Sequence, residues 1–310
     1  AYVLCCGGIE SARLLLLSDD VAPRGLGNER DLVGRFFMDH PFLRTGELVQ
    51  TGAEALDEIY PDFERGGRRF RPALRLGEAL ERRHELSGCA LYLWRSDDHR
   101  SEATRAAARL HDAARRVAWP DDLAHDVAAV AADLAGLYDD VLGDPVGPRA
   151  PRLEIMCLLE QAPDPESRVS LSSERDDWGQ RRARVDWRLG ERERRTLELA
   201  TESLARELGR LGLGRVRLAH WLDAHEGFAP GPLDYNHHMG TTRMSDDPGR
   251  GVVDASCRVH GVENLYVAGS SVFPTSGVSG PTLTLLALAL RLADHLVAVL
   301  ARSGSTATMR

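Results

Sequence analysis

The chain opens with an apolar run, a pair of glycines and a helical pattern. Tyr2 to Cys6 is short and apolar, Gly7 and Gly8 interrupt it, and Ile9 to Leu17 has a helical composition. This order predicts a buried parallel strand, a turn and a helix, which together form half of a βαβ unit. Such a unit requires neighbouring strands, and the sequence nearby does not obviously supply them.

The middle of the chain combines helical and strand patterns. Residues 101–142 are rich in Ala, Leu, Asp and Arg and divide at a Trp-Pro pair, which predicts two helices because proline ends one helix and can begin another. Strands are predicted near 153–159, 167–171 and 183–189. The last of these alternates polar and apolar positions, as expected for a sheet with one buried face.

Two further helices are predicted in the second half of the chain. Residues 191–209 form an amphipathic pattern, with an apolar stripe that we expect to face the core. Near the end, an apolar strand from Leu265 to Ala268 is followed by a turn, and residues 281–301 form a long apolar helix that Pro281 opens.

Composition narrows the class of protein. The 310 residues suffice for one large domain or two smaller ones, and the net charge of −8 argues against a non-specific nucleic-acid binder. The five cysteines have irregular spacing and no CxxC pair, so we expect neither a disulfide framework nor a metal site, and a reducing, cytoplasmic location. Because no unbroken run of 18 apolar residues occurs, no membrane span is expected. The chain begins at Ala1 within an apolar run, so it is expected to be an incomplete fragment.

The final strand, turn and helix form one candidate site. Gly269 and Ser270 end the strand, and Gly280, Pro281 and Thr282 open the helix. A helix N-terminus offers unpaired backbone N–H groups and a partial positive charge, which suit an anion or a cofactor. Helix N-termini are common, so a plain strand–loop–helix without a ligand is the competing interpretation.

Adjacent histidines form a second candidate. His237 and His238 follow Asn236, and successive strand positions face opposite sides, so only one of the two is expected to enter a given site. A histidine can accept a proton from an alcohol near neutral pH. A surface or structural pair is the alternative, and a metal site with Asp234 is a poorer one because the two side chains diverge.

The segment from 237 to 296 carries the most specific signal. The string HHMGTTRM begins at His237, and VVDASCRVHGVENLYVAGSSVFPTSGVSGPTLTLLALALRLADHL follows from 252. Together they resemble the C-terminal signature of the glucose–methanol–choline (GMC) oxidoreductases, most nearly the bacterial branch that oxidises sugars or polyols. Other segments resemble the family in the same order: YVLCCGGIESARLLLL from Tyr2, NERDLVGRFFMDHP from Asn28, and PDPESRVSL from Pro163 with the Val-Asp-Trp at 185–187.

The resemblance implies FAD as cofactor and oxidation of an alcohol CH–OH group by hydride transfer to the flavin N5. His237 matches the active-site histidine of the family and is expected to act as the base, with His238 behind it. We therefore expect the His237 imidazole and the start of the final helix to converge on one flavin ring. The positions expected to contact FAD are Gly7, Gly8, Asn236, Gly269, Ser270, Pro281 and Thr282.

This sequence departs from the family pattern at two points. The family usually has Asn or His where this chain has Gly280, so a second partner for the substrate hydroxyl is missing. We predict that Gly280→Asn raises alcohol oxidation. No GxGxxG string occurs, although that motif holds the FAD pyrophosphate on a helix N-terminus. The chain alone is therefore expected to bind FAD weakly, with a missing N-terminal segment or another chain completing the fold.

The expected fold class is α/β, with an α+β substrate domain on a partial FAD-binding Rossmann-like domain that lacks the N-terminal dinucleotide-binding motif. Residues 1–40 are a remnant of the FAD-binding domain, and 236–302 return to it. Residues 41–235 form the substrate domain, with a helical insertion at about 98–145 and an antiparallel sheet. The substrate is a small alcohol or sugar, and the sequence leaves the electron acceptor unknown. The alternative is a non-catalytic scaffold or partner subunit that keeps the fold without turnover.

Overall fold

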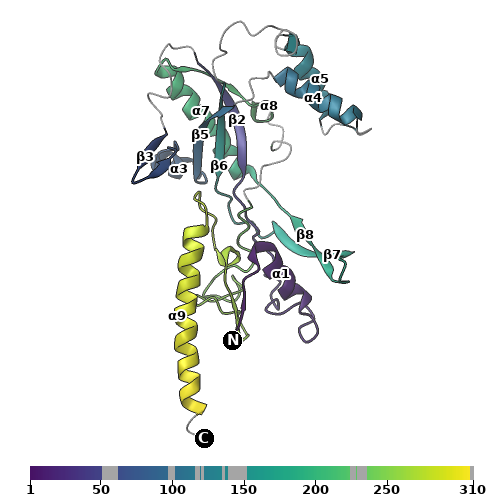
Figure 1. Ribbon diagram of the computed structural model, residues 1–310, viewed down its shortest axis with the longest axis vertical. Coiled ribbons are helices and arrows are strands. Elements are labelled where there is room, and N and C mark those ends of the chain that lie inside the picture. Colours follow the sequence, from purple (N-terminus) through teal and green to yellow (C-terminus); the bar gives the residue numbers. More distant parts are fainter. Residues whose placement is uncertain are drawn as a thin grey trace.

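The computed structural model describes residues 1–50, 62–96, 102–115, 119, 122–134, 137–138, 152–223, 228 and 236–307. Helices and strands are mixed along the described residues, which form two regions stacked along the long axis of the molecule (Figure 1). We call the upper one the sheet region, because it is built on the largest sheet. We call the lower one the terminal region, because it combines both ends of the chain.

Antiparallel strands form the centre of the sheet region. Among the described residues their order is β5-β6-β2-β9. The strands are β2 (Phe42–Gln50), β5 (Cys89–Ser96), β6 (Arg152–Leu159) and β9 (Gly214–Leu218). Helix α7 (Glu191–Arg210) packs on this sheet, and its apolar stripe is buried: Leu197, Ala200, Leu204 and Leu208. The predicted antiparallel sheet and the core-facing stripe are therefore present.

Smaller elements surround the sheet. They are the hairpin of β3 (Phe63–Arg65) and β4 (Arg68–Phe70), and the helices α3 (Glu78–His84), α4 (Glu102–Arg115), α5 (Leu123–Ala132) and α8 (His220–Asp223). Helices α4 and α5 lie side by side at the top of the molecule (Figure 1), and the Arg109 guanidinium lies 2.6 Å from the Asp126 carboxylate between them. The two helices predicted around the Trp-Pro pair are confirmed.

The terminal region joins segments that are far apart in the sequence. Strand β1 (Tyr2–Leu4) pairs in parallel with β10 (Leu265–Val267). Around this pair lie α1 (Gly7–Leu17), the hairpin of β7 (Arg168–Arg175) and β8 (Arg181–Asp186), the 3₁₀ turn η1 (Ser270–Val272) and α9 (Thr282–Ala307). Their shared core includes Leu15, Met38, Val169, Met239 and Val267. Several distant stretches therefore have to fold together to form it.

The first strand corrects one expectation. It is parallel, as its apolar sequence predicted, but Tyr2 is 70% exposed and Val3 is 39% exposed. An apolar run predicts burial when sheet neighbours and helices cover both faces. In the described part of the chain β1 pairs with β10 alone, so much of its surface stays uncovered.

Helix α9 bears on the expectation about membranes. Its segment Thr282–Arg302 is long and apolar enough to span a membrane by length and composition, with a mean hydropathy of 1.9. The segment contains no unbroken apolar run of that length because Arg291 and Asp294 interrupt it. One such helix is weak support for a span, since the core helix of a soluble protein can pass the same criteria.

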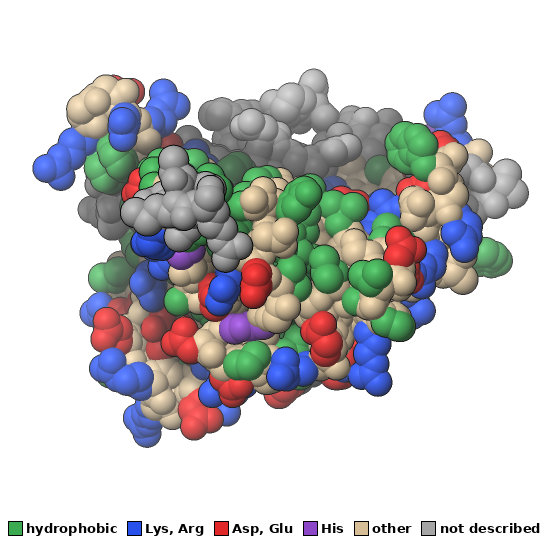
Figure 2. Space-filling view, turned by 90° about the horizontal axis from the view of Figure 1, so that it is seen from below, with side chains coloured by type: hydrophobic (Ala, Val, Ile, Leu, Met, Phe, Trp, Pro, Cys, Tyr) green, Lys and Arg blue, Asp and Glu red, His purple; other side chains and the backbone are tan. Residues whose placement is uncertain are grey.

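The two faces of α9 differ in their surroundings. One face packs on the terminal core through Leu285, Leu288, Leu292 and Leu296. Other apolar side chains are exposed on the helix: Leu283, Leu286, Leu290, Val297 and Leu300. From below, apolar side chains gather across the middle of the molecule, with charged side chains mostly around them (Figure 2). A helix that is apolar all round usually has a covering surface on more than one side.

Candidate active site

His237 lies where the sheet region and the terminal region meet. Its backbone N–H donates to Oδ1 of Asp39 over 3.0 Å, and its ring Nδ1 lies 2.9 Å from Nδ1 of His40. The two imidazoles meet edge to face, with ring centroids 5.2 Å apart. Just beyond, Met239 and Met38 exchange two backbone hydrogen bonds, so the segments carrying His40 and His237 run side by side.

The segment that carries Asp39 and His40 is buried and held by a glutamine. Both side chains are at most 1% exposed. The Asp39 backbone N–H donates to Oε1 of Gln161, a buried residue that directly follows the sheet. The same oxygen accepts the indole N–H of Trp187 over 2.8 Å, and Nε2 of Gln161 donates to the Arg188 carbonyl. Because the oxygen and the nitrogen of its amide are both hydrogen-bonded, Gln161 holds the backbone of Asp39 in place, directly before His40.

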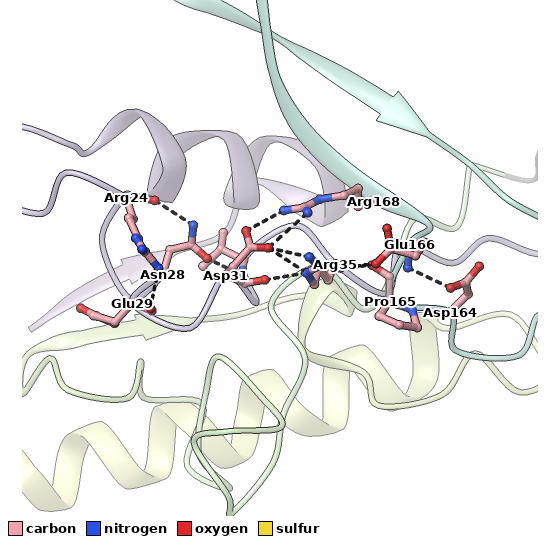
Figure 3. Close-up of polar contacts among 10 residues, drawn as sticks. Arg24, Asn28, Glu29, Asp31, Arg35, Asp164, Pro165, Glu166 and Arg168 are labelled. Carbon is pink, nitrogen blue, oxygen red and sulfur yellow. Dashed lines mark hydrogen bonds and ion pairs between the residues drawn. The ribbon is translucent and has the colours of Figure 1, made fainter.

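A network of charges anchors the loop that leads into this segment (Figure 3). Asp31 accepts from the guanidinium of Arg168 over 3.0 Å and also pairs with Arg35, which reaches Glu166 over 2.6 Å. The Arg168 hydrogen bond, followed by that of Arg35, lowers the pKa of the Asp31 carboxyl. The loop is thereby tied to β7 and its flanks before the chain reaches Asp39.

Gly280 lies beside the His237 ring. A Cβ atom added to Gly280 would be 3.8 Å from Cε1 of His237, which is an ordinary van der Waals contact. Gly280 directly precedes Pro281, which is buried, and Thr282, which is exposed at the first turn of α9. The structure thus brings the imidazole and the start of the final helix together.

Two of the predicted turn residues, Gly8 and Ser270, lie against the backbone of His238. The Ser270 hydroxyl donates to the His238 carbonyl over 2.6 Å. A Cβ on Gly8 would lie 2.5 Å from the same carbonyl oxygen, so a larger residue at Gly8 would displace this backbone. Gly269 has a φ of +125°, a conformation that favours glycine, and space surrounds its Cα.

Three other predicted positions, Gly7, Asn236 and Thr282, are exposed. Asn236 has a left-handed backbone with φ of 55°, which asparagine tolerates better than most residues. This conformation turns the chain immediately before His237. The predicted roles of these three residues toward a cofactor stay predictions.

The rings of the two adjacent histidines lie against different aromatic rings, although both residues are close to Asp39. The His238 ring lies 5.5 Å from Phe37, and its Nε2 is 3.7 Å from Oδ2 of Asp39. That buried oxygen has no hydrogen-bond partner among the described residues. Across the same residues, no group of three or more His, Cys, Asp or Glu side chains could hold a metal ion. Asp234, the third ligand of the metal hypothesis, lies outside them.

Burial sets the basicity of His237. It lowers the pKa of the imidazole below the ordinary value of 6.5, and the neighbouring His40 lowers it further, while the Asp39 carboxylate opposes both. Desolvation disfavours the charged ring, so the ring is neutral near pH 7. A neutral imidazole can accept a proton, which is the property that a base for an alcohol requires.

Sequence reasoning missed Asp39, His40 and Gln161 as site residues. The Met-Asp-His-Pro string at 38–41 offered a signal, because two adjacent ionisable residues stood in a segment that resembled the family. Gln161 offered none. Its importance comes from contacts with Trp187 and Asp39, which lie 26 and 122 positions away in the sequence.

The family comparison covers both histidines and the start of α9. Residues 163–289 match the family model described as GMC oxidoreductase. Over these residues the chain is similar to the GMC oxidoreductases. This match confirms the predicted family, and FAD is the cofactor that this family implies. The matched residues include β7, β8, α7 and the whole stretch from His237 to the first turns of α9.

Individual relatives match most of the chain. The fructose dehydrogenase large subunit of Gluconobacter japonicus is 28% identical over 96% of this chain and 47% of the relative. The 6'''-hydroxyparomomycin C oxidase of Streptomyces lividus is 28% identical over 96% of this chain and 45% of the relative. The chain therefore spans about half the length of these curated relatives.

Solved structures of similar arrangement include the pyridoxine 4-oxidase from Mesorbium loti. The match covers 94% of this chain and 50% of the pyridoxine 4-oxidase chain, with 17% sequence identity and a TM-score of 0.47.

Proposed function

We propose that this chain is the substrate-binding and active-site part of an FAD-dependent oxidoreductase that oxidises a CH–OH group of a sugar or polyol. The observation that carries the proposal is the His237 imidazole beside the start of α9, within the residues that are similar to the GMC oxidoreductases. The names of two relatives, the fructose dehydrogenase large subunit and the 6'''-hydroxyparomomycin C oxidase, support a sugar-like substrate.

His237 has the base role in this proposal. Its neutral ring accepts the proton of the substrate hydroxyl while the hydride leaves the same carbon. FAD, when bound, supplies the acceptor for that hydride. A positioned base contributes about 10²–10⁴-fold to a rate. His238 has a structural role, and Gly280 contributes space beside the base instead of a second polar side chain.

The residues around the site fit the flavin end of FAD. Gly280, just before α9, lies beside His237, and a Cβ added at Gly269 would meet no atom within 4 Å. The positions proposed to contact FAD are Gly7, Gly8, Asn236, Gly269, Ser270, Pro281 and Thr282. The sequence has no GxGxxG string for the pyrophosphate, so these residues would hold only part of the cofactor.

The exposed apolar surfaces of the terminal region support a shared FAD-binding domain. Residues 1–40 and 236–302 would form one part of it, and further sequence or another chain would cover α9 and extend the β1–β10 pair. Residues 41–235 would form the substrate domain, apart from the hairpin of β7 and β8, which packs on the core of the terminal region. This division would provide a covering surface for the exposed apolar side chains of α9 and β1, such as Leu283 and Tyr2.

Flavin reduction tests the proposal. The complete protein, assembled with whatever segment or chain supplies the pyrophosphate site, is loaded with FAD and mixed anaerobically with sugars and polyols. We expect at least one of them to bleach the flavin absorbance, and a chelator to leave the rate unchanged. Bound flavin that no alcohol reduces would instead support the non-catalytic scaffold, and loss of activity with a chelator would support a metal.

A further inference from the structure

The contacts of His40 determine which of its nitrogens carries a proton. Its Nε2 lies 2.9 Å from the carbonyl oxygen of Gly277. A carbonyl oxygen only accepts hydrogen bonds, so this nitrogen must donate. A neutral imidazole has one N–H, and Nδ1 of His40 is therefore an acceptor.

The same reasoning extends to His237. Its Nδ1 lies 2.9 Å from Nδ1 of His40, and a hydrogen bond between them requires one donor. Because His40 accepts there, His237 donates from Nδ1. The lone pair of the neutral His237 ring is then on Nε2, and a proton can be accepted only at a lone pair.

We propose that His40 is a positioning residue that fixes His237 as the Nδ1–H tautomer and so makes Nε2 the proton-accepting atom. The chemical meaning of this tautomer rests on the proposed function. The tautomer itself is a property of the described chain and can be measured without a reaction.

The surroundings hold this arrangement rigid. Oδ1 of Asp39 accepts the backbone N–H of His40 over 2.6 Å and that of His237 over 3.0 Å, so one carboxylate oxygen aligns both residues. His40 is 0% exposed. The backbones that carry both rings are therefore held by the same carboxylate, and the rings meet edge to face in the absence of substrate.

Proton transfer requires no rearrangement of this chain of hydrogen bonds. The O–H bond of the substrate breaks, and a new N–H bond forms at Nε2 of His237. The resulting imidazolium still donates from Nδ1 to His40, whose own proton stays directed at the Gly277 carbonyl. Titratable groups that face the ring include Asp39, His40 and His238.

A protonated His40 is the competing arrangement. It would donate from both ring nitrogens, to Gly277 and to His237, and would leave the proton of His237 on Nε2. The base would then be blocked. Burying such a charge is costly unless a partner compensates it, and both ring nitrogens of His40 are already engaged with uncharged groups.

Histidine NMR tests the tautomers directly. In the 310-residue chain labelled with ¹⁵N-histidine, long-range ¹H–¹⁵N spectra at neutral pH distinguish protonated from unprotonated ring nitrogens. We expect a protonated Nδ1 and an unprotonated Nε2 for His237, with the opposite pattern for His40. A proton on Nε2 of His237, or two protons on His40, would overturn the proposal.

Two substitutions separate the two contacts of His40 in the complete, FAD-loaded protein. His40→Asn keeps an amide oxygen near the position of Nδ1, so it retains an acceptor for His237. His40→Gln reaches toward the Gly277 carbonyl with an amide N–H but offers no acceptor at that position. We expect flavin reduction to slow about 10–100-fold in the Gln variant, by analogy with other residues that orient a catalytic histidine, and distinctly less in the Asn variant.

Controls keep this test decisive. His260 also bonds a backbone carbonyl through Nε2, that of Ser245 over 2.9 Å, so His260→Asn controls for the loss of a carbonyl-bonded imidazole and should leave the rate unchanged. Equal losses in both His40 variants, with the flavin still bound, would contradict the tautomer role. If NMR shows the expected tautomers but no alcohol reduces the flavin of the wild type, the proposed function fails and the tautomer assignment stands.

Discussion

The sheet region and the terminal region differ in where their exposed apolar side chains lie. Both have a buried core, which in the sheet region includes Ile155, Leu159 and Leu197. Exposed apolar side chains of the sheet region are spread over several elements around a core that its own elements close. In the terminal region five of them lie along α9 alone, so this region leaves an open apolar surface.

Residues of the candidate site come from both regions. The sheet region contributes residues that orient His237, and the terminal region contributes most of the positions proposed to contact FAD. Asp39 and His40 lead directly into β2, and Gln161 follows β6, so the closed sheet holds the groups that orient His237. The positions proposed for FAD lie mostly on the open terminal region. We infer that the base is already oriented in this chain, whereas cofactor binding depends on covering α9 and extending β1.

The largest expected effect comes from opening the closed core. Leu197→Ala removes a fully buried side chain and should lower the free energy of unfolding by about 2–5 kcal/mol. Leu211 is 55% exposed, and Leu211→Ala should change stability by no more than about 0.5 kcal/mol. Urea unfolding measures both. Hydrogen exchange should rise in β6 more than in β10, and an equal rise in both strands would show that the cores are not separate.

Polar substitutions on α9 test whether the exposed apolar surface of the terminal region is covered in the complete protein. Replacing Leu283, Leu290 and Val297 with Ser should reduce self-association of the isolated chain in sedimentation experiments, because exposed apolar patches promote association. In the complete protein the same variant should lose stability, up to about 1.5–3 kcal/mol for each side chain that becomes covered. Leu211→Ser is the control. No change in either setting would mean that this face of α9 has no covering surface.

Changing pH tests the environment of His237. Burial lowers its pKa, so the ring stays neutral to a lower pH than an ordinary histidine and accepts protons there. Flavin reduction in the complete protein should fall with an acid limb centred below pH 6.5. The unfolded chain takes up its proton first as the pH falls through 6.5, so this residue also reduces stability at acidic pH. An acid limb above 6.5 would contradict the assigned environment.

The smallest expected effect is a gain at Gly280. An added Cβ makes only an ordinary contact with His237, so Asn fits there and can offer a hydrogen bond to the substrate hydroxyl. One such bond is worth about 0.5–1.5 kcal/mol, which corresponds to a gain of about 2–12-fold in the rate of flavin reduction. Gly280→Ala adds the Cβ without the hydrogen bond and should change little. An Asn variant no faster than the Ala variant would count against this placement of the substrate.

Local patterns predicted much of the fold. The apolar stripe of α7 and the proline at the start of α9 each reflect forces within one element, so the sequence was enough. The alternation predicted for 183–189 was only partly right, because β8 ends at Asp186 and Val185 is 40% exposed. The exposure of β1 was not predictable in this way, because burial depends on which other strands and helices are present. The same holds for α9, whose apolar composition says nothing of which face is covered.

The residues of the candidate site also fall into those that the sequence predicted and those that it did not. His237 and Gly280 stood out because they belong to short, specific strings. Asp39 and His40 were missed as site residues because their importance arises from contacts across the chain, such as the bond from the His237 N–H to Asp39, which joins residues 198 positions apart. Hydrogen bonds between distant segments leave no periodic trace in a sequence, and the tautomer of a histidine depends on such bonds entirely.

The central claim is that His237 is the base for oxidation of an alcohol beside a bound flavin. The most direct measurement is the anaerobic rate of flavin reduction by the best sugar or polyol in the complete protein and in its His237→Gln variant. We predict that the variant keeps its bound FAD but is slowed about 10²–10⁴-fold. A variant that retains FAD and reduces it at the wild-type rate would contradict the claim.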